Sequence, residues 1–259
     1  MIEIKNLSFS YELLKIRLRI IKEIVFVLKD ISFSINDNEF FCLIGPSGCG
    51  KSTLLKILAG FETPTTGEIL DDGKKISGVS YERAMVFQED AVFPWLNVHG
   101  NVEYGLKVRG ISKEIREEKV SHAINLVGLK GFEKLLPREL SGGMKKRVDL
   151  ARVLANEPKI LLMDEPFGSL DAMTKEILQE KLINIWENSK KTILFITHDI
   201  EEALFLGDRI AIMQSVKNGG SVEFFNIPFK RPRNIYLKEE QKFQKMRRDL
   251  VELFKKYEI

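Results

Sequence analysis

The chain has 259 residues, of which 44% are hydrophobic and 30% are charged, so it is long enough to bury a core without disulfides and is neither disordered nor fibrous in composition. Its formal net charge of +3 argues against a dedicated nucleic-acid-binding domain, which would be markedly more basic. Two cysteines, Cys42 and Cys49, exclude a disulfide framework or a cysteine-rich zinc site and fit a reducing, cytosolic compartment.

Along the chain, β-rich runs alternate with helix-like segments, which is typical of an α/β protein. Amphipathic periodicity predicts helices around 120–127 and 250–257. The region from about 89 to 155 contains no convincing strand, and 12–24 looks like a long apolar connection. No signal peptide and no stretch of about 18 uncharged apolar residues is evident, so we do not expect the chain to cross a membrane by itself. Predicted strands cover 2–7, 25–35, 40–44, 83–87, 160–163, 192–197 and 209–213.

Residues 45–52 read Gly-Pro-Ser-Gly-Cys-Gly-Lys-Ser and match the pattern G-x-x-x-x-G-K-[S/T]. An apolar strand precedes the pattern and a helix-like run follows it, so backbone N–H groups of the turn can surround a phosphate at the start of a helix. The Lys51 ammonium would contact the β- and γ-phosphates, and the Ser52 hydroxyl would bind Mg²⁺. The predicted phosphate-binding loop contains Gly45, Pro46, Ser47, Gly48, Cys49, Gly50, Lys51, Ser52 and Thr53.

Two further segments carry groups that suit nucleotide chemistry. The apolar run 160–163 ends in Asp164 and Glu165, where one carboxylate can hold the Mg²⁺ shell and the next can polarise a water. Ser141, Gly142 and Gly143 begin a helix-like segment and offer a second anion site through backbone N–H groups. Taken alone, the carboxylate pair also fits a strand leaving the core, and Ser-Gly-Gly also fits a capped turn.

In this order and spacing the motifs resemble those of the nucleotide-binding subunit of ATP-binding-cassette transporters, over nearly the whole chain. The resemblance implies an α/β fold: a P-loop NTPase with a RecA-like core, an antiparallel β subdomain and an inserted α-helical subdomain. We expect the ATP-binding core with the β subdomain at 1–88 and 158–230, the helical subdomain at 89–157, and a basic amphipathic helix at 231–259. The matching motifs are Walker A at 45–53, the Q-loop Gln88, the signature motif at 140–144, Walker B at 161–165, the D-loop Ser169-Leu170-Asp171 and the switch His198.

The reaction implied by the resemblance is hydrolysis of ATP, with ATP and Mg²⁺ as the cofactors. Lys51, Ser52 and Asp164 would manage the phosphates and Mg²⁺. Glu165 would act as general base or water-orienting group, and His198 would contact the γ-phosphate and hold Glu165 and the water in line.

The resemblance also implies a head-to-tail dimer of two chains around two ATP molecules. Ser141, Gly142 and Gly143 of one copy would contact the ATP held by the other copy. Gln88 would sense Mg²⁺ and the attacking water within its own copy, and Asp171 in the D-loop joins the nucleotide-binding residues.

The sequence departs from the family pattern at a few positions. Tyr11 is the natural match for the adenine-stacking aromatic, with Phe9 in reserve, but the connection 12–24 is longer and more apolar than we expect. Lys145 and Lys146 replace the glutamine-rich continuation after the signature motif, and Asp149 stands where small residues are usual. Neither of the last two departures is expected to abolish catalysis.

The segment from Gln88 to about 106 resembles the importer branch that handles nitrate, sulfonates, taurine or related small oxyanions. This resemblance implies transmembrane permease partners, an extracytoplasmic binding protein in indirect contact, no nucleic acid, and a peripheral place at the cytoplasmic face of the membrane. Phe93, Pro94 and Trp95 would dock the permease; core packing is the competing explanation. The alternative function is a soluble cassette ATPase of DNA repair, translation or iron–sulfur assembly, and a weaker one is an exporter.

Overall fold

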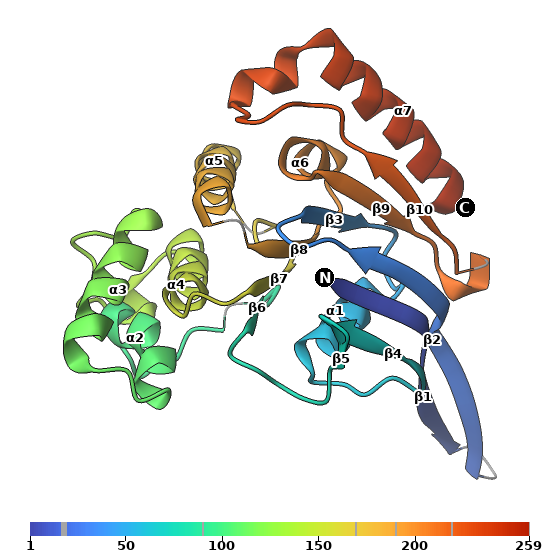
Figure 1. The fold of residues 1–259 in the computed structure, drawn as a ribbon, viewed down its shortest axis with the longest axis horizontal. Helices are drawn as coiled ribbons and strands as arrows, with labels where there is room; N and C mark the ends of the chain where they lie inside the picture. The colour runs from blue at the N-terminus through green and yellow to red at the C-terminus, as the bar shows by residue number, and fades with distance from the viewer. Residues whose placement is uncertain (17–19, 90, 169, 190, 219, 259) are drawn as a thin grey trace.

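The computed structural model describes residues 1–16, 20–89, 91–168, 170–189, 191–218 and 220–258. Within them lies a six-stranded sheet and a four-stranded antiparallel sheet, with helices around both (Figure 1). The six-stranded sheet is parallel except for its first strand, and it contains, from edge to edge, β10 (Val222–Asn226), β9 (Arg209–Met213), β3 (Phe40–Ile44), β8 (Thr192–Ile196), β7 (Ile160–Asp164) and β6 (Arg83–Val86).

Successive side chains of β3 point to opposite faces of the sheet and so belong to two separate layers of the core. Phe40, Cys42 and Ile44 face the layer that includes side chains of α5 (Ala172–Ser189) and α6 (Ile200–Leu206). Phe41 and Leu43 face the opposite layer, which includes α1 (Lys51–Ala59) and the antiparallel sheet. Helices therefore cover both faces of the parallel sheet (Figure 1). This arrangement confirms the α/β class and places the carboxyl ends of β3, β7 and β8 at one edge, where ligands bind in such sheets.

The four-stranded sheet is made of β1 (Ile2–Ile16), β2 (Ile20–Ile35), β4 (Thr66–Asp71) and β5 (Lys74–Lys75). β1 and β2 pair in antiparallel register as far as Ile16 with Ile20, so the predicted connection 12–24 is wrong. Residues 12–16 and 20–24 are the outer part of a β-hairpin, and 17–19 lie outside the described residues. The two strands extend from the body as a two-stranded arm (Figure 1). The prediction ended both strands early because charged residues interrupt the apolar pattern, although β-branched residues still favour strand there.

Helices make up the region between β6 and β7 in the described residues. They are α2 (Val98–Val108), α3 (Lys113–Leu126), the 3₁₀ turn η1 (Pro137–Glu139) and α4 (Gly142–Ala155). Val120, Ala123, Ile124 and Val127 of the predicted helical stripe are buried against the other helices of this region. α2 and α3 lie at one side of the molecule, away from the antiparallel sheet (Figure 1).

The 3₁₀ turn η2 (Val216–Asn218) lies between β9 and β10, and the C-terminal segment after β10 contains η3 (Ile235–Glu239) and α7 (Gln241–Glu258). α7 begins ten residues later than the helix predicted for 231–259. Arg233 explains part of this difference, because it is buried and donates to the carbonyl oxygens of Phe205 at 2.9 Å and Gly207 at 2.7 Å. That burial lowers the Arg233 pKa to about 10. In the described part of the chain, no helix has the length and apolarity needed to span a membrane.

Candidate active site

The loop between β3 and α1 is shaped by close approaches at two glycines. A Cβ atom at Gly45 would lie 2.4 Å from the carbonyl oxygen of Met213, so only glycine lets the loop pass β9 this closely. Gly50 has a φ of +104°, and a Cβ there would meet Leu28 Cδ2 at 2.5 Å. The chain therefore enters α1 through the left-handed backbone region, and the unpaired N–H groups of the first helical turn face the loop.

Lys51 is buried, and its ammonium lies inside the loop. Nζ donates to the carbonyl oxygens of Gly45 at 2.7 Å and Pro46 at 3.0 Å. Burial raises the pKa of the neighbouring Cys49 thiol, so this thiol stays protonated at neutral pH. The described partners of the ammonium are thus uncharged groups. A buried cation held in this way can form strong, charge-assisted hydrogen bonds with a phosphate.

Asp164 lies at the end of β7, beside the loop. Its carboxylate accepts a hydrogen bond from the Ser52 hydroxyl, and burial raises its pKa against the opposing effects of Ser52 and Lys51. Oxygen ligands suit Mg²⁺, which completes its shell with waters and phosphate oxygens. Among the residues described, no group of three or more His, Cys, Asp or Glu is arranged to hold a metal ion. The Ser52–Asp164 pair therefore fits a cation shared with a phosphate better than an all-protein cage.

Glu165 is in contact with two of the predicted catalytic residues. His198 Nδ1 lies 3.0 Å from Glu165 Oε2, and Gln88 Nε2 donates to the same oxygen at 3.4 Å. The backbone of Glu165 has a φ of +44°, an uncommon conformation for a non-glycine residue that is often found at functional sites. Its N–H donates to Ile196 O at 3.0 Å, which fixes it to the end of β8. Three strand ends thus bring one carboxylate, one imidazole and one amide together.

A buried polar network behind His198 was not predicted from the sequence. Glu202 is buried and accepts hydrogen bonds from Thr197 Oγ1 and from Gln179 Nε2, the latter at 2.9 Å. Burial raises the Glu202 pKa, and Lys175, whose Nζ lies 3.3 Å from it, opposes that rise. The network ties α5 and α6 to the turn that carries His198. The sequence signal that could have indicated it is Glu202 itself, a carboxylate four residues after His198 in the run Thr197-His198-Asp199-Ile200-Glu201-Glu202.

The Ser141–Gly143 turn lies at the start of α4. Ser141 caps the helix by accepting from Met144 N at 3.3 Å, and both Ser141 and Gly142 are exposed. A Cβ at Gly143 would lie 3.2 Å from Leu170 Cδ2, so the turn is beside the predicted D-loop. Asp171 is also exposed and accepts from Thr174 N at 3.0 Å; this bond to the backbone lowers its pKa. The D-loop residue Ser169 lies outside the described residues.

The structure separates the two candidates for the adenine-stacking aromatic. Phe9 is 5% exposed and belongs to the core, whereas Tyr11 is 42% exposed. The two rings meet edge to face at 4.9 Å, so Phe9 supports Tyr11. Phe9 pairs with Leu28 across the hairpin, the residue that approaches Gly50. Tyr11 is therefore the available aromatic two positions further along the same strand, while the reserve Phe9 has no accessible face to offer.

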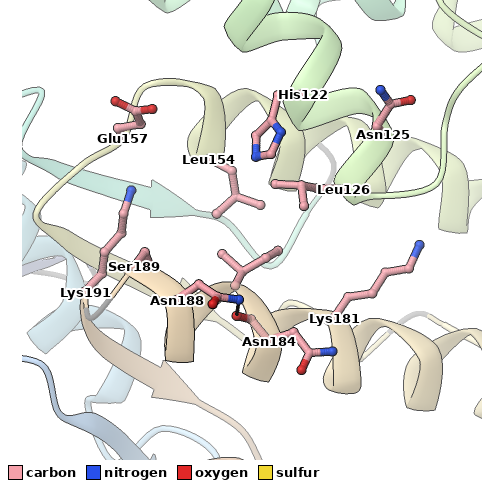
Figure 2. Close-up of a pocket in the computed structure, with 11 residues that line it drawn as sticks. His122, Asn125, Leu126, Leu154, Glu157, Lys181, Asn184, Asn188, Ser189 and Lys191 are labelled. Atoms are coloured by element: carbon pink, nitrogen blue, oxygen red, sulfur yellow. Dashed lines mark hydrogen bonds between the residues drawn. The ribbon is translucent and has the colours of Figure 1, made fainter.

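A cavity of about 780 Å³ lies away from all of these residues, between α3, the end of α4 and α5 (Figure 2). Leu126, Leu154 and Ile185 supply its apolar surface, and Lys181 and Lys191 come from the α5 side. None of the predicted site residues lines it. The phosphate-binding loop is thus identified by its chemistry and its place at the sheet edge, and not by the position of this cavity.

A two-layered α/β core with a lysine-bearing loop at the start of a helix and a carboxylate at the neighbouring strand end defines a P-loop nucleotide-binding protein. The model of the ABC transporter family matches residues 28–168. The chain is 51% identical over 191 residues to a nitrate import ATP-binding protein of Synechocystis, covering 74% of this chain and 72% of that protein. The chain therefore belongs to the ABC transporter family.

Two further comparisons agree with this assignment. An aliphatic sulfonates import ATP-binding protein of Bacillus anthracis is 46% identical over 228 residues, which is 88% of each chain. The dimeric structure of a post-hydrolysis state of an ATP-binding cassette, bound to ADP and Pi, superposes with a TM-score of 0.72 at 33% identity, covering 82% of this chain and 94% of that one. The predicted cassette fold is thereby confirmed.

Proposed function

We propose that this chain is the ATP-hydrolysing subunit of an importer for small oxyanions of the nitrate and sulfonate type. Membership of the ABC transporter family supports the transport role, and the names of the compared import proteins support the substrate class. The observation that carries the enzymatic part is the meeting of Glu165 with His198 and Gln88 at one carboxylate oxygen. These groups stand beside Asp164, whose carboxylate accepts a hydrogen bond from Ser52 of the phosphate-binding loop.

In this proposal each residue has a defined task. The N–H groups of the loop 45–50 and the Lys51 ammonium bind the β- and γ-phosphates. Ser52 and Asp164 would hold Mg²⁺, and the side-chain carbonyl oxygen of Gln88 would be a further ligand. The ion would neutralise phosphate charge as it develops. Glu165 accepts a proton from, or orients, the attacking water.

His198 and Gln88 keep the Glu165 carboxylate in place, and His198 also reaches the γ-phosphate. Catalysis would come mainly from positioning and charge stabilisation. The test is a pair of variants. Glu165→Gln should bind ATP but lose hydrolysis by about 10²–10⁴-fold, the usual contribution of a positioned base, while Lys51→Ala should weaken ATP binding itself. Full turnover in Glu165→Gln, or unchanged ATP affinity in Lys51→Ala, would overturn the proposal.

A second copy of the chain is the proposed partner at the nucleotide. Ser141 and Gly142 at the start of α4 are exposed, and the compared ADP-bound cassette is dimeric. Two copies placed head to tail would bring this turn, with Asp171 nearby, onto the nucleotide of the other copy. The resemblance to cassette ATPases also supports our proposed division of the chain. The ATP-binding core would comprise 1–88 and 158–230, the helical subdomain 89–157, and the C-terminal segment 231–259.

The proposed permease contact is the aromatic cluster formed by Phe93, Trp95 and Tyr104. Trp95 is 70% exposed, so the core-packing explanation for it is wrong. Phe93 lies between the other two rings, with centroid distances of 5.4 Å to Trp95 and 4.6 Å to Tyr104. A groove of about 360 Å³ begins beside Phe93 and Tyr104. Exposed aromatic anchors next to a groove are typical of protein interfaces.

A permease seated on this cluster would keep the subunit at the cytoplasmic face of the membrane, with the extracytoplasmic binding protein in indirect contact through the permease. The alternative, a soluble cassette ATPase of repair, translation or iron–sulfur assembly, has no comparable support. The compared relatives are named as import proteins.

A further inference from the structure

One buried face of α4 carries three charged residues at intervals of three: Lys146, Asp149 and Arg152. Lys146 is 2% exposed and Asp149 is 0% exposed. Two of the three are departures from the family pattern noted in the sequence. Burying charged side chains is costly unless strong hydrogen bonds compensate for the lost water. The hydrogen-bond partners of these three residues therefore indicate what the buried charges do.

Lys146 and Arg152 donate hydrogen bonds to main-chain carbonyl groups of the segment that follows β6. Lys146 Nζ donates to Phe87 O and, at 3.0 Å, to Gln88 O. Arg152 Nη1 donates to Ala91 O at 2.6 Å, and Arg152 Nη2 pairs with Asp149. The positively charged groups of α4 thus hold the backbone on either side of Gln88, and Asp149 orients one of them. We call Lys146, Asp149 and Arg152 the α4 clamp.

We propose that Lys146 is a positioning residue for Gln88: it fixes the backbone from which the Gln88 amide reaches Glu165. This inference rests on the proposed function. An ammonium has three donors and can serve two adjacent carbonyl oxygens at once, which suits it to hold a peptide plane against rotation. The Gln88 amide then stays within 3.4 Å of Glu165 Oε2.

The clamp also joins two parts of the nucleotide machinery. Ser141, at the N-terminus of α4, precedes Lys146 by five residues, which is roughly 7.5 Å along a helix. A rigid helix therefore connects the turn that would contact ATP of the second copy with the segment that carries Gln88. Arg152 extends this connection, because its guanidinium lies 5.2 Å from the centroid of the Phe93 ring, in the proposed permease contact.

A double-mutant cycle separates positioning from simple stabilisation of the fold. Lys146→Met keeps the length and packing of the side chain and removes its donors. We expect it to lower kcat about tenfold while ATP affinity stays within about twofold. In a Gln88→Ala background, Lys146→Met should alter kcat by less than about twofold, because substitutions that act through the same contact are not additive.

Lys119→Met is the matched control, since Lys119 lies on α3 and forms its ion pair with Glu157 within the helical region. It should leave kcat near the wild-type value. If Lys146→Met folds poorly, Lys146→Gln, which keeps one amide donor group, is used in the same cycle and should show a smaller, equally non-additive loss.

An unchanged kcat in Lys146→Met, or a full tenfold loss that persists in the Gln88→Ala background, would overturn the positioning role. Failure of the proposed function appears elsewhere, as normal turnover in Glu165→Gln or normal ATP affinity in Lys51→Ala. The two failures are therefore distinguishable.

Discussion

The two tryptophans of the chain offer a matched pair for testing the proposed permease contact. Trp95 is 70% exposed, whereas Trp186 is 5% exposed and packs against Phe40 at a centroid distance of 6.0 Å. The buried share of Trp95 is 100 − 70 = 30%. For an aromatic side chain of up to about 250 Å², this corresponds to about 75 Å² and, at about 25 cal/mol per Å², to at most ~2 kcal/mol.

Truncation of each residue should therefore affect stability differently. Trp95→Ala should lower the free energy of unfolding by no more than ~2 kcal/mol, whereas Trp186→Ala should lower it by ~3–5 kcal/mol. With about 2–4 °C of melting temperature per kcal/mol for a chain of this size, thermal unfolding of the isolated subunit should resolve the two. Basal ATPase activity of Trp95→Ala should stay near that of the wild type.

The functional effect of Trp95→Ala should appear when the permease is present. An interface anchor contributes about 2 kcal/mol or more, which corresponds to roughly a 30-fold weaker association. Co-purification with the permease, or titration of detergent-solubilised permease, measures this loss. A drop in stability as large as that of Trp186→Ala, with normal assembly of the folded fraction, would refute the proposed role of Trp95 in the permease contact.

Two other variants test the nucleotide site. Asp164→Asn should raise the melting temperature of the ligand-free protein at neutral pH while removing hydrolysis, because burial raises the pKa of this carboxyl. A carboxyl with a raised folded pKa stabilises the fold fully only below the unfolded Asp pKa of about 3.9, and it loses that contribution as the pH rises through the folded pKa. The increase in melting temperature of Asp164→Asn should therefore be absent at acid pH. A lower melting temperature of Asp164→Asn at neutral pH would contradict this prediction. Tyr11→Ala should weaken ATP binding about two- to tenfold, which is the contribution of one stacked ring. Tyr236→Ala is the control, because Tyr236 is also exposed. Equal ATP affinities of Tyr11→Ala and the wild type would show that another residue makes the adenine contact.

The parallel sheet was predictable because its inner strands are almost entirely apolar. β3, β7 and β8 are buried along their whole length, and their predicted bounds differ from the observed ones by at most one residue. The exposed strand β5 and the partly exposed strands β4 and β10 were not predicted, because their polar residues interrupt the apolar pattern. The same cause led to the error in the β1–β2 hairpin, whose pairing arises between strands rather than from either sequence alone.

The phosphate-binding loop could be found from sequence because its spacing follows directly from the geometry of a turn around a phosphate. Glu165 and His198 are 33 residues apart, and only the family resemblance indicated that they act together. The α4 clamp gave no sequence signal beyond two unusual residues. Its meaning depends on Lys146 meeting carbonyl groups 58 and 59 residues earlier in the chain, a contact that no local pattern encodes.

The most direct test of the central claim is the molar mass of Glu165→Gln in solution, measured by size-exclusion chromatography with light scattering, with and without ATP and Mg²⁺. If Glu165 drives hydrolysis and hydrolysis reopens the dimer, this variant should be a monomer without ATP and accumulate as a dimer with it. Adding Lys51→Ala to the same variant should abolish the ATP-dependent dimer. A Glu165→Gln protein that stays monomeric with ATP and hydrolyses it at the wild-type rate would contradict the account.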